Sequence, residues 1–464
     1  MAIDADGTSV VERGAAGRAG RWRALRTDGV FERLNRPLDI ASLALFRILF
    51  GAMMLLATLR FIAKGWVDEF YTRPSVYFPY CGFEWVRPLS APWMHVLFVA
   101  LAVFALLIAV GLYYRLSITG FFVLFSYIEL IDKSVYLNHY YLISLLALLL
   151  STMPLEGAWS LDALRDPSRR RRQIPAWCLY LLRMQVGLVY LFAGVGKLTP
   201  DWLLQGQPLR LWLAMYAELP LIGSWLATAW VGQAMSLFGA AFDLLAPFAL
   251  LWRRTRAVAY IVVVLFHVAT GLLFPIGVFP WVMVLCATLF FDPSWPRRVR
   301  RTVTARDDDE GERLRSTDEP PKARLGRVGG LLIAVHILLQ LALPLRHWLY
   351  PGRVSWTEEG FRFSWMVMVI EKRGTLEYRV RARHGARNWT VNPRAYLRPH
   401  QLRQLVTQPD MILALAHHIA RDFRRRGYPE VEVRADSFVS LNARLPQRLI
   451  DDRVDLARVS DGLR

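Results

Sequence analysis

Four ionisable side chains occur within or directly beside stretches that are otherwise apolar. They are Lys197 after 177–196, His139 near the start of 136–153, Asp243 within 226–252 and His267 within 257–274. A charged side chain at membrane depth is energetically costly, and such residues commonly serve proton transfer or ligand binding. These four residues are therefore the first candidates for chemistry.

Lysine is a rare choice in this chain. Of the 57 lysine and arginine residues, only five are lysines, namely Lys64, Lys133, Lys197, Lys322 and Lys372. A guanidinium keeps its proton in proteins, whereas a lysine ammonium in an apolar pocket can lose one and become a base. Lys197 is therefore a candidate general base. The alternative is a lysine that extends its ammonium to the membrane interface from the end of a span.

The other three candidates also have simpler explanations. His139 would serve equally as a hydrogen-bonded histidine at the interface, and Asp243 and His267 as polar contacts between helices. We find no spacing typical of a metal site, a Ser/His/Asp triad or a pair of catalytic carboxylates. The adjacent His417 and His418 point to different helix faces, and the three cysteines imply no disulfide framework.

Apolar stretches long enough to cross a bilayer carry these residues. The chain has 464 residues, 54% of them apolar, and a mean hydropathy of +0.27, which excludes a disordered protein. The nine candidate spans are about 40–63, 91–112, 116–131, 136–153, 177–196, 226–252, 257–274, 276–291 and 329–349. The expected fold is mostly α, a polytopic membrane helical bundle of about eight or nine spans.

The net charge of +19 is concentrated in short clusters between these stretches. The clusters comprise Arg169 to Arg172, then Arg253, Arg254 and Arg256, then Arg297, Arg298, Arg300 and Arg301. This pattern is typical of cytoplasmic loops and argues against a nucleic-acid-binding protein. With a cytoplasmic N-terminal arm and nine spans, every cluster falls inside and the C-terminal tail falls outside. Eight spans would place the tail inside.

The same topology predicts that His139 and Lys197 lie at similar depth on the outer side. The fourth span starts at its outer end and the fifth finishes there, so two neighbouring antiparallel helices can bring the residues to one cavity. His267 could approach the same layer. Gly194 and Gly196 would let another helix or a flat ligand come close to Lys197.

Three regions follow from composition. Residues 1–37 form a polar cytoplasmic arm, 38–350 the transmembrane region with a charged loop at 302–327, and 351–464 a small extramembrane α+β domain. In the last region, Phe361–Val369 and Leu376–Arg383 have the composition of strands flanking Gly374. Met411–Arg426 has helical spacing and stops at Gly427.

The chain resembles the vitamin K-dependent γ-glutamyl carboxylases and their bacterial homologues, also described as horizontally transferred transmembrane domain (HTTM) proteins. The resemblance covers about residues 38 to 430. It is carried by Leu130 to Ser134, Asn138-His139-Tyr140-Tyr141-Leu142, Ala193-Gly194-Val195-Gly196-Lys197-Leu198 with Asp201-Trp202, Phe266-His267, Phe274 to Phe279, Gly360 to Trp365, Val391 to Pro393 and Pro409 to His418.

This resemblance implies an enzyme that couples two reactions. Lys197 matches the family lysine that deprotonates reduced vitamin K or a related quinol. The quinol anion then reacts with dioxygen, and the oxygenated product removes a γ-proton from glutamate. Carbon dioxide adds to the resulting carbanion. His139 matches the family histidine associated with the carbanion step. Asn138, Tyr140, Gly194, Gly196, Asp243 and His267 would line the quinone pocket, and no metal is expected.

The resemblance also implies partners and a location. The expected partners are membrane lipid, a lipid-soluble quinol and a glutamate-containing peptide or protein. Nucleic acid is not an expected partner. Arg362 and Trp365 would contribute to an extramembrane substrate surface, although packing and salt bridging would explain both equally. The expected location is a bacterial plasma membrane with the C-terminal domain outside.

Some family features are absent from the sequence. The animal enzymes have a lysine pair where this chain has Gly196-Lys197, they extend further at the C-terminus, and they form a disulfide, whereas no cysteine follows Cys286 here. Three alternatives therefore remain. The protein is a carboxylase-like enzyme, an epoxidase or different-substrate homologue, or a non-catalytic membrane binding or scaffold protein.

Overall fold

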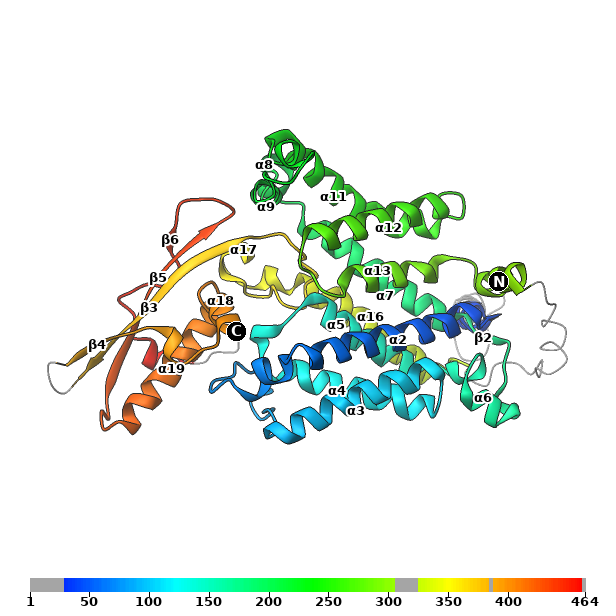
Figure 1. The fold of residues 1–464 in the computed structure, drawn as a ribbon, viewed down its shortest axis with the longest axis horizontal. Coiled ribbons are helices and arrows are strands. Elements are labelled where there is room, and N and C mark those ends of the chain that lie inside the picture. The colour runs from blue at the N-terminus through cyan, green and yellow to red at the C-terminus, as the bar shows by residue number, and fades with distance from the viewer. Residues whose placement is uncertain (1–28, 305–323, 384–386, 461–464) are drawn as a thin grey trace, which may run out of the picture.

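The computed structural model describes residues 29–304, 324–383 and 387–460. A bundle of long helices makes up one part of the molecule, and a small sheet with two helices lies beyond one end of it (Figure 1). We call this end of the bundle the tail face. Most of the predicted arm 1–37 and of the charged loop 302–327 lies outside the described residues.

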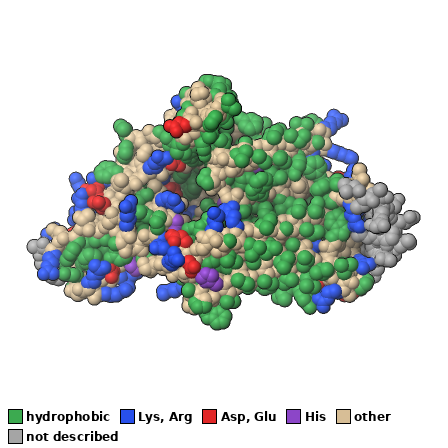
Figure 2. Space-filling view, viewed as in Figure 1, with side chains coloured by type: hydrophobic (Ala, Val, Ile, Leu, Met, Phe, Trp, Pro, Cys, Tyr) green, Lys and Arg blue, Asp and Glu red, His purple; other side chains and the backbone are tan. Residues whose placement is uncertain are grey.

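All nine predicted apolar stretches are helical. Among the described residues, seven helices are long and apolar enough to cross a membrane. They are α2 (Ala41–Ala63), α3 (Ala91–Val110), α4 (Tyr114–Ile131), α7 (Ala176–Gly196), α11 (Ala229–Leu251), α12 (Arg256–Leu273) and α16 (Arg327–Leu345, extended to Leu349 by a 3₁₀ turn). Hydrophobic side chains cover the helical part of the surface, as Figure 2 shows. The protein is therefore a mostly helical, multi-pass membrane protein, as predicted.

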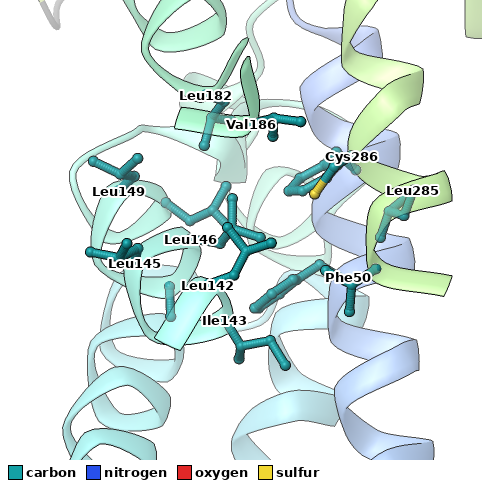
Figure 3. Packing of buried hydrophobic residues seen from close by; sticks show 14 of the residues in the cluster. Phe50, Leu142, Ile143, Leu145, Leu146, Leu149, Leu182, Val186, Leu285 and Cys286 are labelled. Atoms are coloured by element: carbon teal, nitrogen blue, oxygen red, sulfur yellow. The ribbon is translucent and has the colours of Figure 1, made fainter. Parts of the chain in front are cut away.

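Two apolar helices are shorter, α5 (Asn138–Ser151) and α13 (Phe279–Ala287). Figure 3 shows α5 inside the bundle, where its leucines meet Phe50 of α2, Leu182 and Val186 of α7, and Cys286 of α13. Irregular backbone at membrane depth is tolerated where protein surrounds it. Burial therefore allows α5 and α13 to be short.

The predicted basic clusters all lie at the end of the bundle opposite the tail face. They belong to the region of α6 (Leu161–Arg165), to the turn before α12 and to α14 (Trp295–Thr304) (Figure 1). The strands β1 (Pro37–Asp39) and β2 (Gln173–Pro175) pair antiparallel at this end. Arg47, which the sequence analysis did not single out, is fully buried in α2 and donates to the carbonyl oxygens of Ile108 and Trp159 at 3.1 and 2.6 Å.

The tail contains a four-stranded antiparallel sheet in the order β4-β3-β5-β6. The strands are β3 (Lys372–Ala382), β4 (Asn388–Val391), β5 (Val431–Leu441) and β6 (Gln447–Arg448), and the helices are α17 (Val354–Thr357), α18 (Pro399–Leu405) and α19 (Pro409–Arg425). Alternate residues of β5 are buried beneath α19. Val76 and Phe78, from the connection between α2 and α3, join this core. The helix predicted before Gly427 is confirmed, and Gly427 has the positive φ of +93° that glycine favours.

The strand predicted for Phe361–Val369 is wrong. This segment forms turns, and Phe363, Trp365 and Met368 all have positive φ values between 55° and 63°. Its aromatic residues pack against the membrane helices instead of alternating across a sheet. Gly374 was expected between two strands but lies within β3, where a Cβ atom would come within 2.9 Å of the Phe438 carbonyl oxygen.

Helices α2 and α3 approach each other closely at Gly51. A Cβ atom at this position would lie 2.5 Å from the backbone nitrogen of Ala109 and 2.7 Å from the carbonyl oxygen of Ala105. Backbone atoms of a packed helix cannot move away as a flexible side chain can. The absence of a side chain at Gly51 therefore sets the spacing of these two spans.

We predict that Gly51→Ala lowers the free energy of unfolding by about 1 to 3 kcal/mol, because the added methyl group forces the two helices apart. Thermal unfolding of the purified protein in detergent would measure the change. Gly187→Ala is the matched control, since a Cβ atom there meets only Pro247 at 3.7 Å. Equal stability of the two variants would contradict the prediction.

Candidate functional site

Lys197 is a buried cation at the tail face. It follows the last residue of α7 and precedes α8 (Pro200–Gln205), and only 5% of its surface is exposed. Its Nζ atom donates to Asp243 Oδ2 at 2.7 Å, to the Ala193 carbonyl oxygen at 3.2 Å and to the Val367 carbonyl oxygen at 3.4 Å. The ring of Trp202 lies 5.2 Å from the same atom. The structure thus brings together two of the four candidate residues, Lys197 and Asp243, as a buried ion pair.

Close packing of α7 and α11 makes this pair possible. A Cβ atom on Gly194 would lie 2.7 to 2.9 Å from atoms of Leu244, including its backbone nitrogen. Any larger residue at position 194 would push α11 away from α7. Glycine therefore lets α11 carry Asp243 to within hydrogen-bonding distance of Lys197. Short helices α8, α9 (Leu209–Ala214) and α10 (Gly223–Leu226) connect the two spans.

The segment 361–369 lies against the tail face, and we call it the cover segment. Besides the bond from Lys197 to Val367, its Met366 would contact a Cβ atom on Gly196 at 3.4 Å. Its Trp365 stacks on Tyr141 of α5 with ring centroids 4.8 Å apart. The turns that replace the predicted strand therefore place a backbone carbonyl group of the tail next to the candidate base.

His139 and His267 both lie close to the ring of Phe279. The His139 ring centroid is 5.9 Å from that of Phe279, and the His267 centroid is 5.8 Å from it. His267 is hydrogen-bonded to the Tyr190 hydroxyl at 2.9 Å, which is a polar contact between α12 and α7. Its place in a quinone pocket stays a prediction. A Cβ atom on Gly277 would lie 3.8 Å from His139 Nε2.

The residues beside His139 have local partners. Asn138 Oδ1 accepts a hydrogen bond from the Tyr136 hydroxyl at 3.1 Å, and the Tyr140 ring meets Phe125 edge-on. None of these contacts reaches the Lys197–Asp243 pair. That His139 and Lys197 face one cavity, with Asn138 and Tyr140 in its lining, stays a prediction.

Arg362 takes part in a second ion cluster between the tail and the bundle. Asp410, at the start of α19, is 3.0 Å from Arg362 and 2.7 Å from Lys133, and Arg362 also bonds to Gln408. Burial acts to raise the pKa of Asp410, but Arg362 and Lys133 outweigh it and lower that pKa to about 2. The Asp410 carboxyl group therefore stays ionised near neutral pH. Arg362 thus makes a salt bridge and Trp365, 1% exposed, is packed in the interior, as the alternative expects. That the two residues contribute to a substrate surface stays a prediction.

The scarcity of lysine is the sequence signal that could have identified these buried ion pairs. Three of the four described lysines form ion pairs with carboxylates from distant parts of the chain or from the tail: Lys133 with Asp410, Lys197 with Asp243 and Lys372 with Glu358. The sequence analysis considered only Lys197. It also missed the buried glutamines Gln185 and Gln340, because an amide carries no charge to draw attention.

The described residues contain no group of three or more His, Cys, Asp or Glu side chains that could hold a metal ion. A cavity of about 230 Å³ opens among residues 154–171, next to α6, and shares no residue with the ion pair. The molecular surface is hollowed below the protrusion at the top of Figure 2, where Figure 1 places α8 and α9.

Comparison with protein families covers both parts of the molecule. The HTTM domain model matches residues 35–295, more than half of the chain, and the model of the vitamin K-dependent gamma-carboxylase lumenal domain matches residues 326–464. No solved structure matches the chain. The two matches thus correspond to the two parts of the molecule, the helical bundle with the Lys197–Asp243 pair and the α+β tail. The chain belongs to the vitamin K-dependent gamma-carboxylase family of HTTM-domain membrane proteins.

Proposed function

We propose that this protein is an integral membrane, quinol-dependent γ-glutamyl carboxylase-like enzyme in which Lys197 is the base that deprotonates the quinol. The observation that carries the proposal is the buried Lys197–Asp243 pair at the tail face. The two family matches support the reaction class. Reduced vitamin K or a related quinol, with dioxygen, would supply the strong base needed to take a γ-proton from glutamate before carbon dioxide adds.

The surroundings of Lys197 fit a lipid-soluble quinol. The ammonium lies beside the Trp202 ring and next to Gly196, above which Met366 and Val369 approach. An apolar site of this kind suits an aromatic ring and keeps water from a reactive product. Bilayer lipid would provide the route by which the quinol arrives.

Asp243 gives Lys197 a way to release a proton. Transfer of one proton from the ammonium to the carboxylate converts the ion pair into an amine and a carboxylic acid, with no change in total charge. In an apolar surrounding this exchange avoids leaving a lone buried charge. The amine then accepts a proton from the quinol hydroxyl, which regenerates the ammonium beside the new negative charge on the quinol oxygen.

The cover segment would couple the tail to this base. The bond from Lys197 to the Val367 carbonyl oxygen is the longest of the three, at 3.4 Å. It is also the only one that comes from the tail. A glutamyl substrate bound between the tail and the membrane would therefore act on the base through this segment, with Arg362 and Trp365 holding the segment in place.

A non-catalytic membrane binding protein is the second candidate. It is favoured by one observation, that all three protons of the Lys197 ammonium already have oxygen acceptors. An epoxidase that lacks carboxylation is a variant of the first candidate.

The deciding experiment is to incubate the purified protein with reduced vitamin K and oxygen, with and without labelled bicarbonate and a glutamyl peptide. Epoxide and fixed label would then be measured separately.

Lys197→Arg preserves the positive charge beside Asp243 but removes the exchangeable proton. We expect this variant to fold and to lose epoxide formation by about 100-fold or more, the usual contribution of general base catalysis. Epoxide formed per minute by purified wild-type and variant protein measures the effect. Full activity of the variant would eliminate Lys197 as the base.

Asp243→Asn should reduce epoxide formation by about 10-fold to 100-fold. Without the carboxylate, the Lys197 proton has to leave to water, so the remaining activity should rise as the pH of the medium is raised. Asp422→Asn is the control, because Asp422 pairs with Arg426 on the tail, away from Lys197. A pH profile unchanged from wild type would show that Asp243 does not accept the proton.

The tail should lie on the non-cytoplasmic side of the membrane. The basic clusters lie at the opposite end of the bundle (Figure 1), and the matching family model is named for a lumenal domain. Cys81 offers a native probe, since it is exposed and lies in the same connection as Val76 and Phe78, which pack into the tail.

An impermeant thiol reagent added to intact cells should therefore label the wild-type protein at Cys81. The same reagent should leave a Cys81→Ser, Arg169→Cys variant unlabelled until the cells are lysed. Mass spectrometry of the labelled peptide identifies the site. Labelling in the reverse pattern would invert the proposed orientation.

A further inference from the structure

A chain of hydrogen bonds runs through the membrane part of the protein and ends at the tail face. His336 Nε2 is 2.9 Å from Gln185 Oε1, Gln185 Nε2 donates to Gln340 Oε1 at 3.1 Å, and Gln340 Nε2 donates to the Tyr141 hydroxyl at 3.0 Å. These residues come from α16, α7 and α5. Gln185 and Gln340 are both almost completely buried. Buried amides between spans need partners, and here they find one another.

All three bonds in this chain have the same direction. When His336 donates to Gln185, each following amide donates to the next residue, and Tyr141 receives the last bond as an acceptor. A phenol that accepts one hydrogen bond still has its own proton to give. Among the described residues, no acceptor is found for that proton. The chain therefore presents Tyr141 as a hydrogen-bond donor.

A second donor without an acceptor lies beside Tyr141. Trp365 stacks on the Tyr141 ring and is 1% exposed, yet its Nε1 has no hydrogen-bond partner in the described part of the structure. Phe363 contacts the Tyr141 ring edge-on at 4.9 Å. Buried donors are rarely left unpaired, because losing the bond to water costs free energy. Two such donors within one aromatic cluster indicate a ligand that brings an acceptor oxygen.

We propose that Tyr141, held as a donor by His336, Gln185 and Gln340, binds a ring oxygen of the quinone at the tail face. The aromatic rings of Trp365 and Phe363 beside Tyr141 suit a flat ring as the ligand, and the burial of Gln185 and Gln340 between membrane spans suits a ligand that enters from lipid. Tyr141 is thus a binding residue, and the two glutamines are positioning residues. The choice of a quinone as the ligand rests on the proposed function.

The test uses the purified full-length protein and menaquinone-4 labelled with ¹³C at its carbonyl groups. Infrared difference spectra report the carbonyl stretching frequency of the bound quinone, and quenching of tryptophan fluorescence reports its affinity. In the wild type, a hydrogen bond from Tyr141 should lower the frequency relative to the free quinone. Tyr141→Phe should return the band toward the free value and weaken binding by about 3-fold to 10-fold.

Gln340→Met keeps the volume of the side chain but breaks the chain, so it provides a second variant that leaves Tyr141 in place. It should shift the carbonyl band in the same direction. The double variant should bind no more weakly than Tyr141→Phe alone, because both changes act through one hydroxyl. Tyr180→Phe, at the opposite end of α7, is the control and should bind as the wild type does.

Two results would overturn the inference in different ways. If the wild type binds the quinone and Tyr141→Phe changes neither the band nor the affinity, Tyr141 does not bind the ring oxygen, while the proposed function stands. If the wild type binds no menaquinone, the ligand assigned to Tyr141 fails, and the epoxide assay with reduced vitamin K decides separately whether the proposed function stands.

Discussion

The ion pair between Lys197 and Asp243 is the interaction on which the tail face depends. Each charge alone would be strongly destabilising among apolar helices, and the two are tolerated because they meet at 2.7 Å with further oxygen acceptors around the ammonium. Their meeting in turn requires that α7 and α11 touch, which Gly194 permits. A glycine, a lysine and an aspartate thus form one structural unit, and the geometry of the neighbouring helices follows from it.

The same constraint explains how the tail is attached. The ammonium reaches beyond the bundle to the carbonyl oxygen of Val367, and the Lys133–Asp410–Arg362 cluster fixes the start of α19 to the connection after α4. Between these two polar attachments, Trp365 and Phe363 pack on α5. Positive φ values at three non-glycine residues would not persist in an isolated peptide. The contacts with the bundle hold this segment in its shape.

The two ends of the bundle use charge differently. Arginine dominates the end away from the tail, where guanidinium groups such as that of Arg47 bond to carbonyl oxygens at the ends of helices. At the tail face, lysines pair with single carboxylates. An arginine binds several acceptors and keeps its proton, whereas a lysine interacts as a compact charge that can exchange a proton.

The sequence by itself determined the class of the protein and the identity of its candidate residues. Apolar stretches of about 20 residues predict spans because the bilayer has a fixed thickness, and the arginine clusters predict which ends lie together because charge stays out of the bilayer. Local rules also predicted the helix that ends at Gly427. They failed at 361–369, where side chains selected for packing on membrane helices have the composition of a strand.

Only the tertiary structure decided which polar groups meet. Lys197 and Asp243 are 46 positions apart, and Gln185 and Gln340 are 155 apart. No periodicity within one helix specifies the partner on another, because that depends on how closely the helices pack and how they are rotated. Hydropathy shows that a polar residue is buried in a span, and the packing of the bundle determines what that residue contacts.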